Sequence, residues 1–89
     1  MHAHLIISGQ VQGVGFRYSA QQQATKYGIV GWVMNREDGT VEMEIEGSED
    51  QISEYIIEIR NGFHRFIHVD NIELDKSNNE KGYKNFDIK

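Results

Sequence analysis

Apolar residues concentrate in three short segments of the chain, and each of these segments predicts a β-strand: the first is aliphatic, the second is β-branched and aromatic, and the third alternates. The segments are residues 3–8, 29–36 and 40–46. In the third segment every second residue is apolar: Val41, Met43 and Ile45. Such alternation is typical of a strand with one buried face and one solvated face. The turn Glu37-Asp38-Gly39 joins the second and third segments as a hairpin.

Two other segments change to the helical period of three to four residues. The first runs from Phe16 to Tyr27, and Gly28 then follows in the position of a left-handed helix cap. The second begins with the sequence of a capping box at Ser48-Glu49-Asp50-Gln51 and ends near Gly62. Its apolar residues lie at helical spacing: Ile52, Tyr55, Ile56 and Ile59.

The last third of the chain predicts a fourth strand over 66–75, a polar loop over 77–82 and a short closing strand over 83–88. The apolar positions of the fourth strand change parity near Asp70-Asn71, which indicates a β-bulge. The element order β-α-β-β-α-β with a short fifth strand predicts an α+β, ferredoxin-like fold. In that fold both helices pack on one face of an antiparallel sheet. We expect residues 1–89 to form one domain.

Composition narrows the class of protein. Nine Lys and Arg against fourteen Asp and Glu give a net charge of −5. This charge argues against broad binding of nucleic acid. RNA-recognition domains share this topology but expose aromatic and basic residues on the sheet, whereas the third strand here offers glutamates, which weakens an RNA-binding interpretation. Cysteine is absent, which excludes disulfides and thiol nucleophiles and suits a reducing compartment. No apolar run approaches the roughly 20 residues of a membrane span. We therefore expect a cytoplasmic monomer without a membrane or nucleic-acid partner.

The loop before the first helix has the residues of an anion-binding cradle. Gly9, Gly13 and Gly15 allow the backbone to curl, and a helix N-terminus presents unpaired N–H groups and a positive dipole end. Arg17 adds a guanidinium suited to two phosphate oxygens. The alternative is that the glycines only turn the chain and that Arg17 is a solvated cation. The glycine spacing fits neither a nucleotide-binding P-loop nor a dinucleotide fingerprint.

Two motifs together resemble the signatures of the acylphosphatases. The first is Gly9-x-Val11-Gln12-Gly13-Val14-x-Phe16-Arg17. The second is Gly31-Trp32-Val33-Met34-Asn35, followed by Gly39-x-Val41 and Gly47. The resemblance covers residues 9–47. It implies a metal-independent hydrolase, without a cofactor or a covalent intermediate, that cleaves the carboxyl–phosphate anhydride bond of small acyl phosphates by direct attack of water.

The same resemblance implies a role for each matching residue. Arg17 would bind the phosphoryl group, and Asn35 would hold and orient the attacking water. The backbone N–H groups that would bind phosphate belong to Gln12, Gly13, Val14, Gly15 and Phe16. For Asn35 the alternative is a turn residue that closes the hairpin. A further alternative is that the fold serves as a non-catalytic anion-binding module.

Other polar and aromatic residues have simpler interpretations. His2 and His4 share one strand face, and His64 lies four residues before His68, but no carboxylate forms a clear third ligand, so we expect no metal site. The glutamates of the third strand are expected on its solvated face: Glu42, Glu44 and Glu46. The segment 62–67 lacks the proline and the small residue that often occur in the family at this position. We expect Phe63 and Phe66 in the core.

Overall fold

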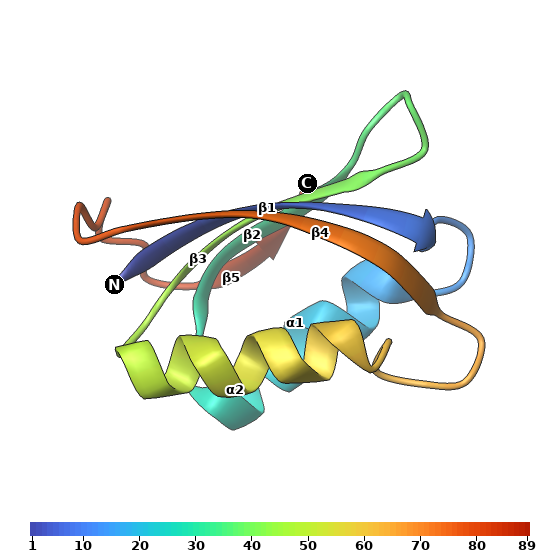
Figure 1. The fold of residues 1–89 in the computed structure, drawn as a ribbon. Coiled ribbons are helices and arrows are strands. Elements are labelled where there is room, and N and C mark those ends of the chain that lie inside the picture. The colour runs from blue at the N-terminus through green and yellow to red at the C-terminus, as the bar shows by residue number, and fades with distance from the viewer.

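The computed structural model describes residues 1–89 and contains seven elements. In chain order they are β1 (His2–Gln10), α1 (Phe16–Tyr27), β2 (Val30–Asn35), β3 (Val41–Glu46), α2 (Glu49–Arg60), β4 (His68–Ser77) and β5 (Phe86–Ile88). The five strands form one sheet, and both helices lie on the same face of it (Figure 1). The predicted ferredoxin-like fold is confirmed.

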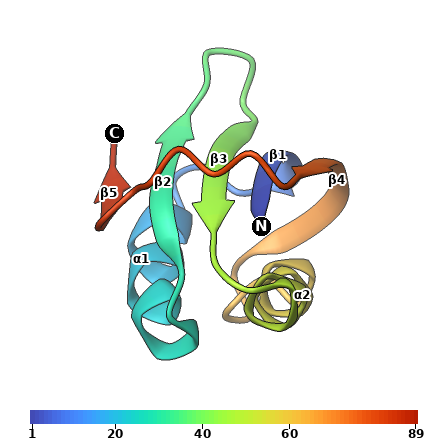
Figure 2. The same ribbon diagram turned by 90° about the vertical axis from the view of Figure 1, so that its left-hand side faces the viewer.

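The sheet has the strand order β4-β1-β3-β2-β5, which Figure 2 displays from one edge strand to the other. The first four strands pair antiparallel, whereas β5 pairs parallel with β2. The sheet is therefore mixed rather than purely antiparallel. The segment 78–85, which we call the strap, connects β4 to β5 by crossing the end of the intervening strands (Figure 2).

The core lies between the sheet and the two helices. The apolar residues of the alternating strands and of the helical stripes fill it, as their spacing predicts. The Tyr55 hydroxyl crosses this core and donates a hydrogen bond of 2.6 Å to the carbonyl oxygen of Ala20 in α1. Burial raises the pKa of Tyr55 well above its usual range, so this hydroxyl stays protonated and joins the helices.

The predicted bulge is present where β4 pairs with β1. Ser8 pairs with Asn71 and Gly9 pairs with Val69, which leaves Asp70 as the extra residue. Gly9 has a φ of 132°, and a Cβ at this position would collide with the carbonyl oxygen of His68. Pairing with β4 continues past the bulge, so β1 extends through Gln10. The loop was expected to begin at Gly9 but begins at Val11.

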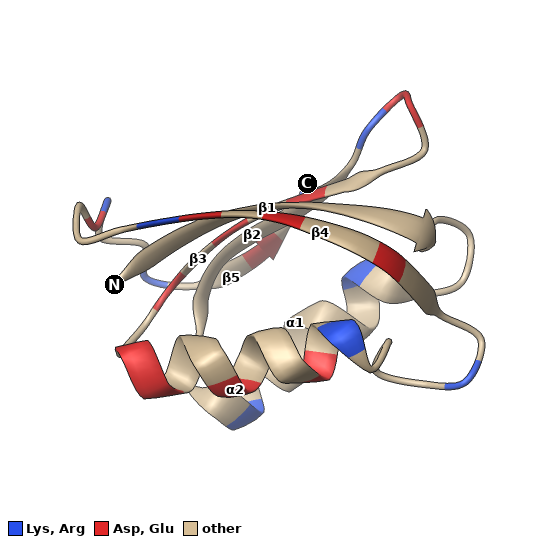
Figure 3. Ribbon diagram, in the orientation of Figure 1, with Lys and Arg blue, Asp and Glu red and all other residues tan.

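Three expectations from the sequence are wrong. β5 begins at Phe86 rather than at residue 83. Phe66 is 60% exposed instead of buried, although Phe63 packs against the core. Acidic residues lie along α2, β4 and β3 (Figure 3). The β3 glutamates were expected on a solvated face, but two of the three are buried, with Glu44 at 9% and Glu46 at 2% exposed. The strap explains this burial, because its residues cover the end of β3.

Candidate active site

The loop between β1 and α1 leaves the positive end of a helix uncompensated. Gly15 is the N-cap of α1, with a φ of 79°, and no side chain caps this terminus. The first turn of α1 contains no acidic residue. In contrast, α2 begins with a complete capping box from Ser48 and has two acidic residues in its first turn. The N-terminus of α2 is therefore capped by the chain itself, whereas the N-terminus of α1 is left available for an anion.

The backbone amides of this loop are also free of protein partners. The first helical hydrogen bond of α1 runs from the N–H of Ser19 to the carbonyl oxygen of Gly15, at 3.0 Å. No N–H group of residues 12–16 donates to a backbone acceptor. These are the five amides that the sequence motif indicates as phosphate ligands. Successive free N–H groups in a curled glycine loop form a concave site for an anion.

Arg17 lies in the first turn of α1, and its guanidinium contacts the residue that follows β5. Its Nη1 donates a hydrogen bond of 3.2 Å to the carbonyl oxygen of Lys89, directly after β5. Gln21, one turn further along α1, donates at 2.9 Å to the carbonyl oxygen of Phe86. Two side chains of α1 therefore fasten β5 beside the loop. The Arg17 guanidinium thus has a partner in the chain, through a hydrogen bond that is exposed to solvent.

Asn35 is the last residue of β2 and pairs with Val41 of β3. Its Oδ1 is buried and has no hydrogen-bond partner in the chain. Asp38 makes the side-chain hydrogen bonds of the turn, accepting from the Thr40 N–H at 3.0 Å and from the Thr40 hydroxyl at 2.6 Å. These two bonds lower the pKa of Asp38. Asn35 is thus a strand residue with an unused amide, and its interpretation as a turn residue is wrong.

One cavity of about 220 Å³ joins the predicted residues. It is lined by Val11, Gly13, Gly15, Phe16, Arg17, Tyr18, Asn35 and Ile88. Gln12 and Val14 do not line the cavity. The Gln12 side chain instead donates two hydrogen bonds of 2.8 Å, to the carbonyl oxygens of Arg36 and Thr40. It braces the loop against the hairpin that carries Asn35.

Three features of this site were missed in the sequence. They are the brace from Gln12 and the cavity-lining side chains of Tyr18 and Ile88. Tyr18 is 60% and Ile88 40% exposed, so these two side chains are the exposed apolar part of the cavity lining. The only available signal was an aromatic residue on the polar side of α1, since Tyr18 lies opposite the apolar stripe of Phe16, Ala20 and Ala24. Nothing in the sequence places Ile88 beside the loop.

The acylphosphatase family model matches residues 3–88 of the chain. The chain belongs to the acylphosphatase family. An acylphosphatase of Bacillus velezensis is 41% identical over 96% of this chain and 93% of its own length. The crystal structure of the acylphosphatase from Bacillus subtilis superposes with a TM-score of 0.93 at 39% identity, covering 98% of this chain and 96% of that one. A Coxiella burnetii acylphosphatase structure gives 0.90 at 31% identity, covering 99% and 90%. An acylphosphatase function, and with it the hydrolase class, follows from this membership.

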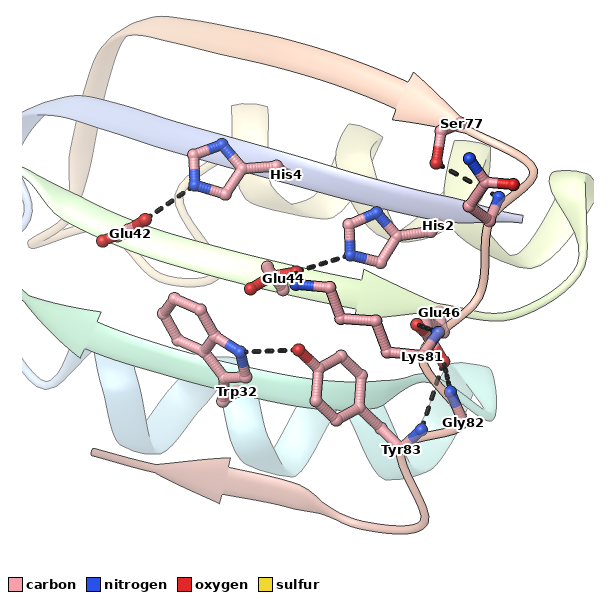
Figure 4. Close-up of polar contacts among 11 residues, drawn as sticks. His2, His4, Trp32, Glu42, Glu44, Glu46, Ser77, Lys81, Gly82 and Tyr83 are labelled. Atoms are coloured by element: carbon pink, nitrogen blue, oxygen red, sulfur yellow. Dashed lines mark hydrogen bonds and ion pairs between the residues drawn. The ribbon is translucent and has the colours of Figure 1, made fainter.

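A second polar cluster lies on the open face of the sheet, opposite the helices (Figure 4). His2 contacts Glu44 and His4 contacts Glu42, each at 2.7 Å, and Lys81 contacts Glu44 at 2.8 Å. Burial alone would raise the pKa of Glu44, but the hydrogen bonds from Lys81 and His2 lower it. No three His, Asp or Glu side chains gather as a set of metal ligands. No helix is both long and apolar enough to cross a membrane.

Proposed function

We propose that the chain cleaves small acyl phosphates at the cavity between the loop 11–15 and the end of β2. The observation that carries this proposal is the arrangement of Arg17, the free amides of the loop and the unpartnered Asn35 around a single cavity. The cation and the amides match a phosphoryl group, and the neutral amide matches a water molecule. A module that only binds anions would need Arg17 and the loop amides but not Asn35.

In the proposed reaction, a water oxygen attacks phosphorus while the bond between phosphorus and the acyl oxygen breaks. The carboxylate leaves with the electron pair of that bond. An acyl phosphate dianion and water thereby give a carboxylate and dihydrogen phosphate, so both protons of the water remain on the phosphate product. No nucleophilic side chain and no metal take part. The work of the protein is to position the reactants and to stabilise charge on the equatorial oxygens.

Each group has a role in this scheme that fits its surroundings. Arg17 binds two phosphoryl oxygens, together with the N–H groups of residues 12–16. The Asn35 carbonyl oxygen accepts a hydrogen bond from the water and turns its lone pair toward phosphorus. The buried Oδ1 has no protein partner, and such a group costs about 1–3 kcal/mol when it stays unpaired. Asn35 therefore carries a stability cost that the catalytic role explains.

Hydrolysis of benzoyl phosphate by the purified chain, measured with and without EDTA, tests this proposal. We expect the same kcat with and without chelator. Arg17→Ala is expected to abolish nearly all turnover and to remain folded by circular dichroism. Activity that disappears in EDTA would contradict the metal-free scheme. An Arg17→Ala variant with wild-type kcat/KM would contradict the site.

We further propose that the chain acts as a cytoplasmic monomer with neither nucleic acid nor membrane as a partner. The absence of cysteine supports a reducing compartment, and the net charge of −5 opposes binding to a phosphate backbone. Light scattering coupled to size exclusion should give a mass near 10.3 kDa. A mass twice as large would contradict the monomer.

A further inference from the structure

The end of β3 furthest from the hairpin contains a buried carboxylate that binds backbone. Glu46 is 2% exposed and accepts hydrogen bonds from three successive amides of the strap. The distances are 2.6 Å from the N–H of Lys81, 3.0 Å from Gly82 and 3.2 Å from Tyr83. Figure 4 shows these amides converging on the carboxylate. Three charge-assisted bonds to consecutive N–H groups fix the path of the strap at this point.

Two neighbouring side-chain contacts hold the same part of the strap. Lys81 forms an ion pair of 2.8 Å with Glu44, and the Trp32 indole donates to the Tyr83 hydroxyl at 3.1 Å. Both contacts lie on the open face of the sheet (Figure 4). They attach side chains of the strap, whereas Glu46 attaches its backbone. Glu46 is therefore the central anchor.

β5 depends on this anchor because the strand itself is weakly held. It has only three residues and pairs on one side, in parallel with β2. The N–H of Gly31 donates to the carbonyl oxygen of Asn85 and the N–H of Lys89 donates to that of Val33, both at 2.8 Å. A three-residue edge strand lies at the lower limit of strand length. The strap sets where such a strand begins.

β5 in turn forms part of the candidate active site. Ile88 lines the cavity, and the Lys89 carbonyl oxygen accepts the hydrogen bond from Arg17 Nη1 at 3.2 Å. A shift of β5 would remove this acceptor and release the guanidinium to sample other rotamers. Glu46 pairs with Val30 at the start of β2, whereas the site lies at the end of β2. Five residue steps at about 3.4 Å separate the two ends by roughly 17 Å.

We propose that Glu46 is a positioning residue for Arg17, acting through the strap and β5. The inference rests on the phosphate-binding role given to Arg17 above. If β5 is loosened, the Arg17 side chain is mobile before phosphate binds, and binding must then also immobilise it. That cost corresponds to an affinity about 2- to 10-fold weaker. Simple electrostatics predicts the opposite sign, because removal of a negative charge should attract phosphate more strongly.

The experiment compares Glu46→Gln with Glu42→Gln, which removes the same charge from the same strand face but contacts His4 rather than the strap. Inorganic phosphate serves as a competitive inhibitor of benzoyl phosphate hydrolysis, well below the unfolding temperature. We expect the Ki for phosphate and the KM to rise about 2- to 10-fold in Glu46→Gln. Neither value should rise in Glu42→Gln. Hydrogen exchange at the Lys89 amide should also accelerate in Glu46→Gln only.

A second variant keeps the test decisive if Glu46→Gln does not fold. Tyr83→Phe removes the hydrogen bond with Trp32 without a change of charge, and it should raise the phosphate Ki in the same direction by a smaller factor. A Ki that is unchanged or lower in Glu46→Gln, or in Tyr83→Phe when only that variant folds, overturns the inference. An equal rise in Glu42→Gln does so too. Phosphate binding to Arg17→Ala, which has too little turnover for an inhibition assay, is measured by titration calorimetry. If Arg17→Ala binds inorganic phosphate as tightly as wild type, the proposed function itself fails. If Arg17→Ala loses phosphate binding while the strap variants match Glu42→Gln, only the role of Glu46 is wrong.

Discussion

Replacement of Asn35 by alanine should change activity and stability in opposite directions. The Oδ1 of Asn35 is buried without a partner, and an unpaired buried acceptor costs about 1–3 kcal/mol. Alanine removes this cost together with a few side-chain contacts. We therefore expect the free energy of unfolding to stay equal or to rise by up to about 2 kcal/mol. Each kcal/mol gained would raise the Tm of a domain this small by about 4–8 °C.

The same substitution removes the group that orients the water. Loss of one positioned polar group at a reacting centre costs about 10²- to 10³-fold in kcat. The KM for benzoyl phosphate should change little, because Arg17 and the loop amides supply the binding. The variant thus separates catalysis from both binding and folding.

Steady-state hydrolysis of benzoyl phosphate and urea unfolding measure these effects. Asn78→Ala, in the exposed strap, is the matched control and should leave both quantities unchanged. The reasoning would be refuted by an Asn35→Ala variant that keeps kcat within about threefold of wild type and loses stability. A tenfold effect on kcat corresponds to about 1.4 kcal/mol of transition-state stabilisation, so a change below threefold is too small for a group that orients the water. Asn35 would then be a structural strand residue.

Three further results are expected. Gly13→Ala and Gly39→Ala introduce a Cβ into open space at positive φ, so each should cost about 1–2 kcal/mol of stability in urea. Only Gly13→Ala should weaken competition by inorganic phosphate, by about tenfold or more; equal effects would argue against the cradle. Tyr18 lines the cavity, so it can contact the acyl group of a bound substrate. Tyr18→Ser should then lower the ratio of kcat/KM for benzoyl phosphate to that for acetyl phosphate by about 2- to 10-fold, the value of one aromatic contact. An unchanged ratio would exclude this contact. Because hydrogen bonds lower the pKa of Glu44 below 4.5 in the folded state, its ionised form adds stability that is lost as the pH falls through the folded value. Glu44→Gln should therefore flatten the fall of the urea midpoint below about pH 4.5, and an identical slope would contradict this contribution.

The arrangement of the predicted site residues follows from local patterns. Arg17 and Asn35 belong to two motifs that lie at the start of α1 and the end of β2, and the hairpin and crossover lengths bring these places together. The resemblance of both motifs to the acylphosphatase signatures, and not their spacing, predicted that they face one site. The roles of both residues stay predictions until the variants are measured.

The features that could not be predicted depend on contacts across the fold. Alternation in β3 correctly predicts that Glu44 and Glu46 share a face, but it carries no information about what covers that face. The strap reaches Glu46 from more than thirty residues further along the chain. The Lys89 acceptor for Arg17 is a backbone carbonyl, which has no signature in any sequence. Phe66 has the composition of a core residue, yet its segment turns outward.

The extra residue at Asp70 also affects how copies of the chain meet. β4 is an edge strand of ten residues, long enough to template strand addition by a second molecule. The bulge interrupts its row of free donors and acceptors, and exposed charges follow along the strand: Asp70, Glu73, Asp75 and Lys76. The opposite edge, β5, is too short to nucleate pairing. Neither border of the sheet thus offers a continuous template, which protects a proline-free, cysteine-free chain from intermolecular β-sheet growth at high concentration.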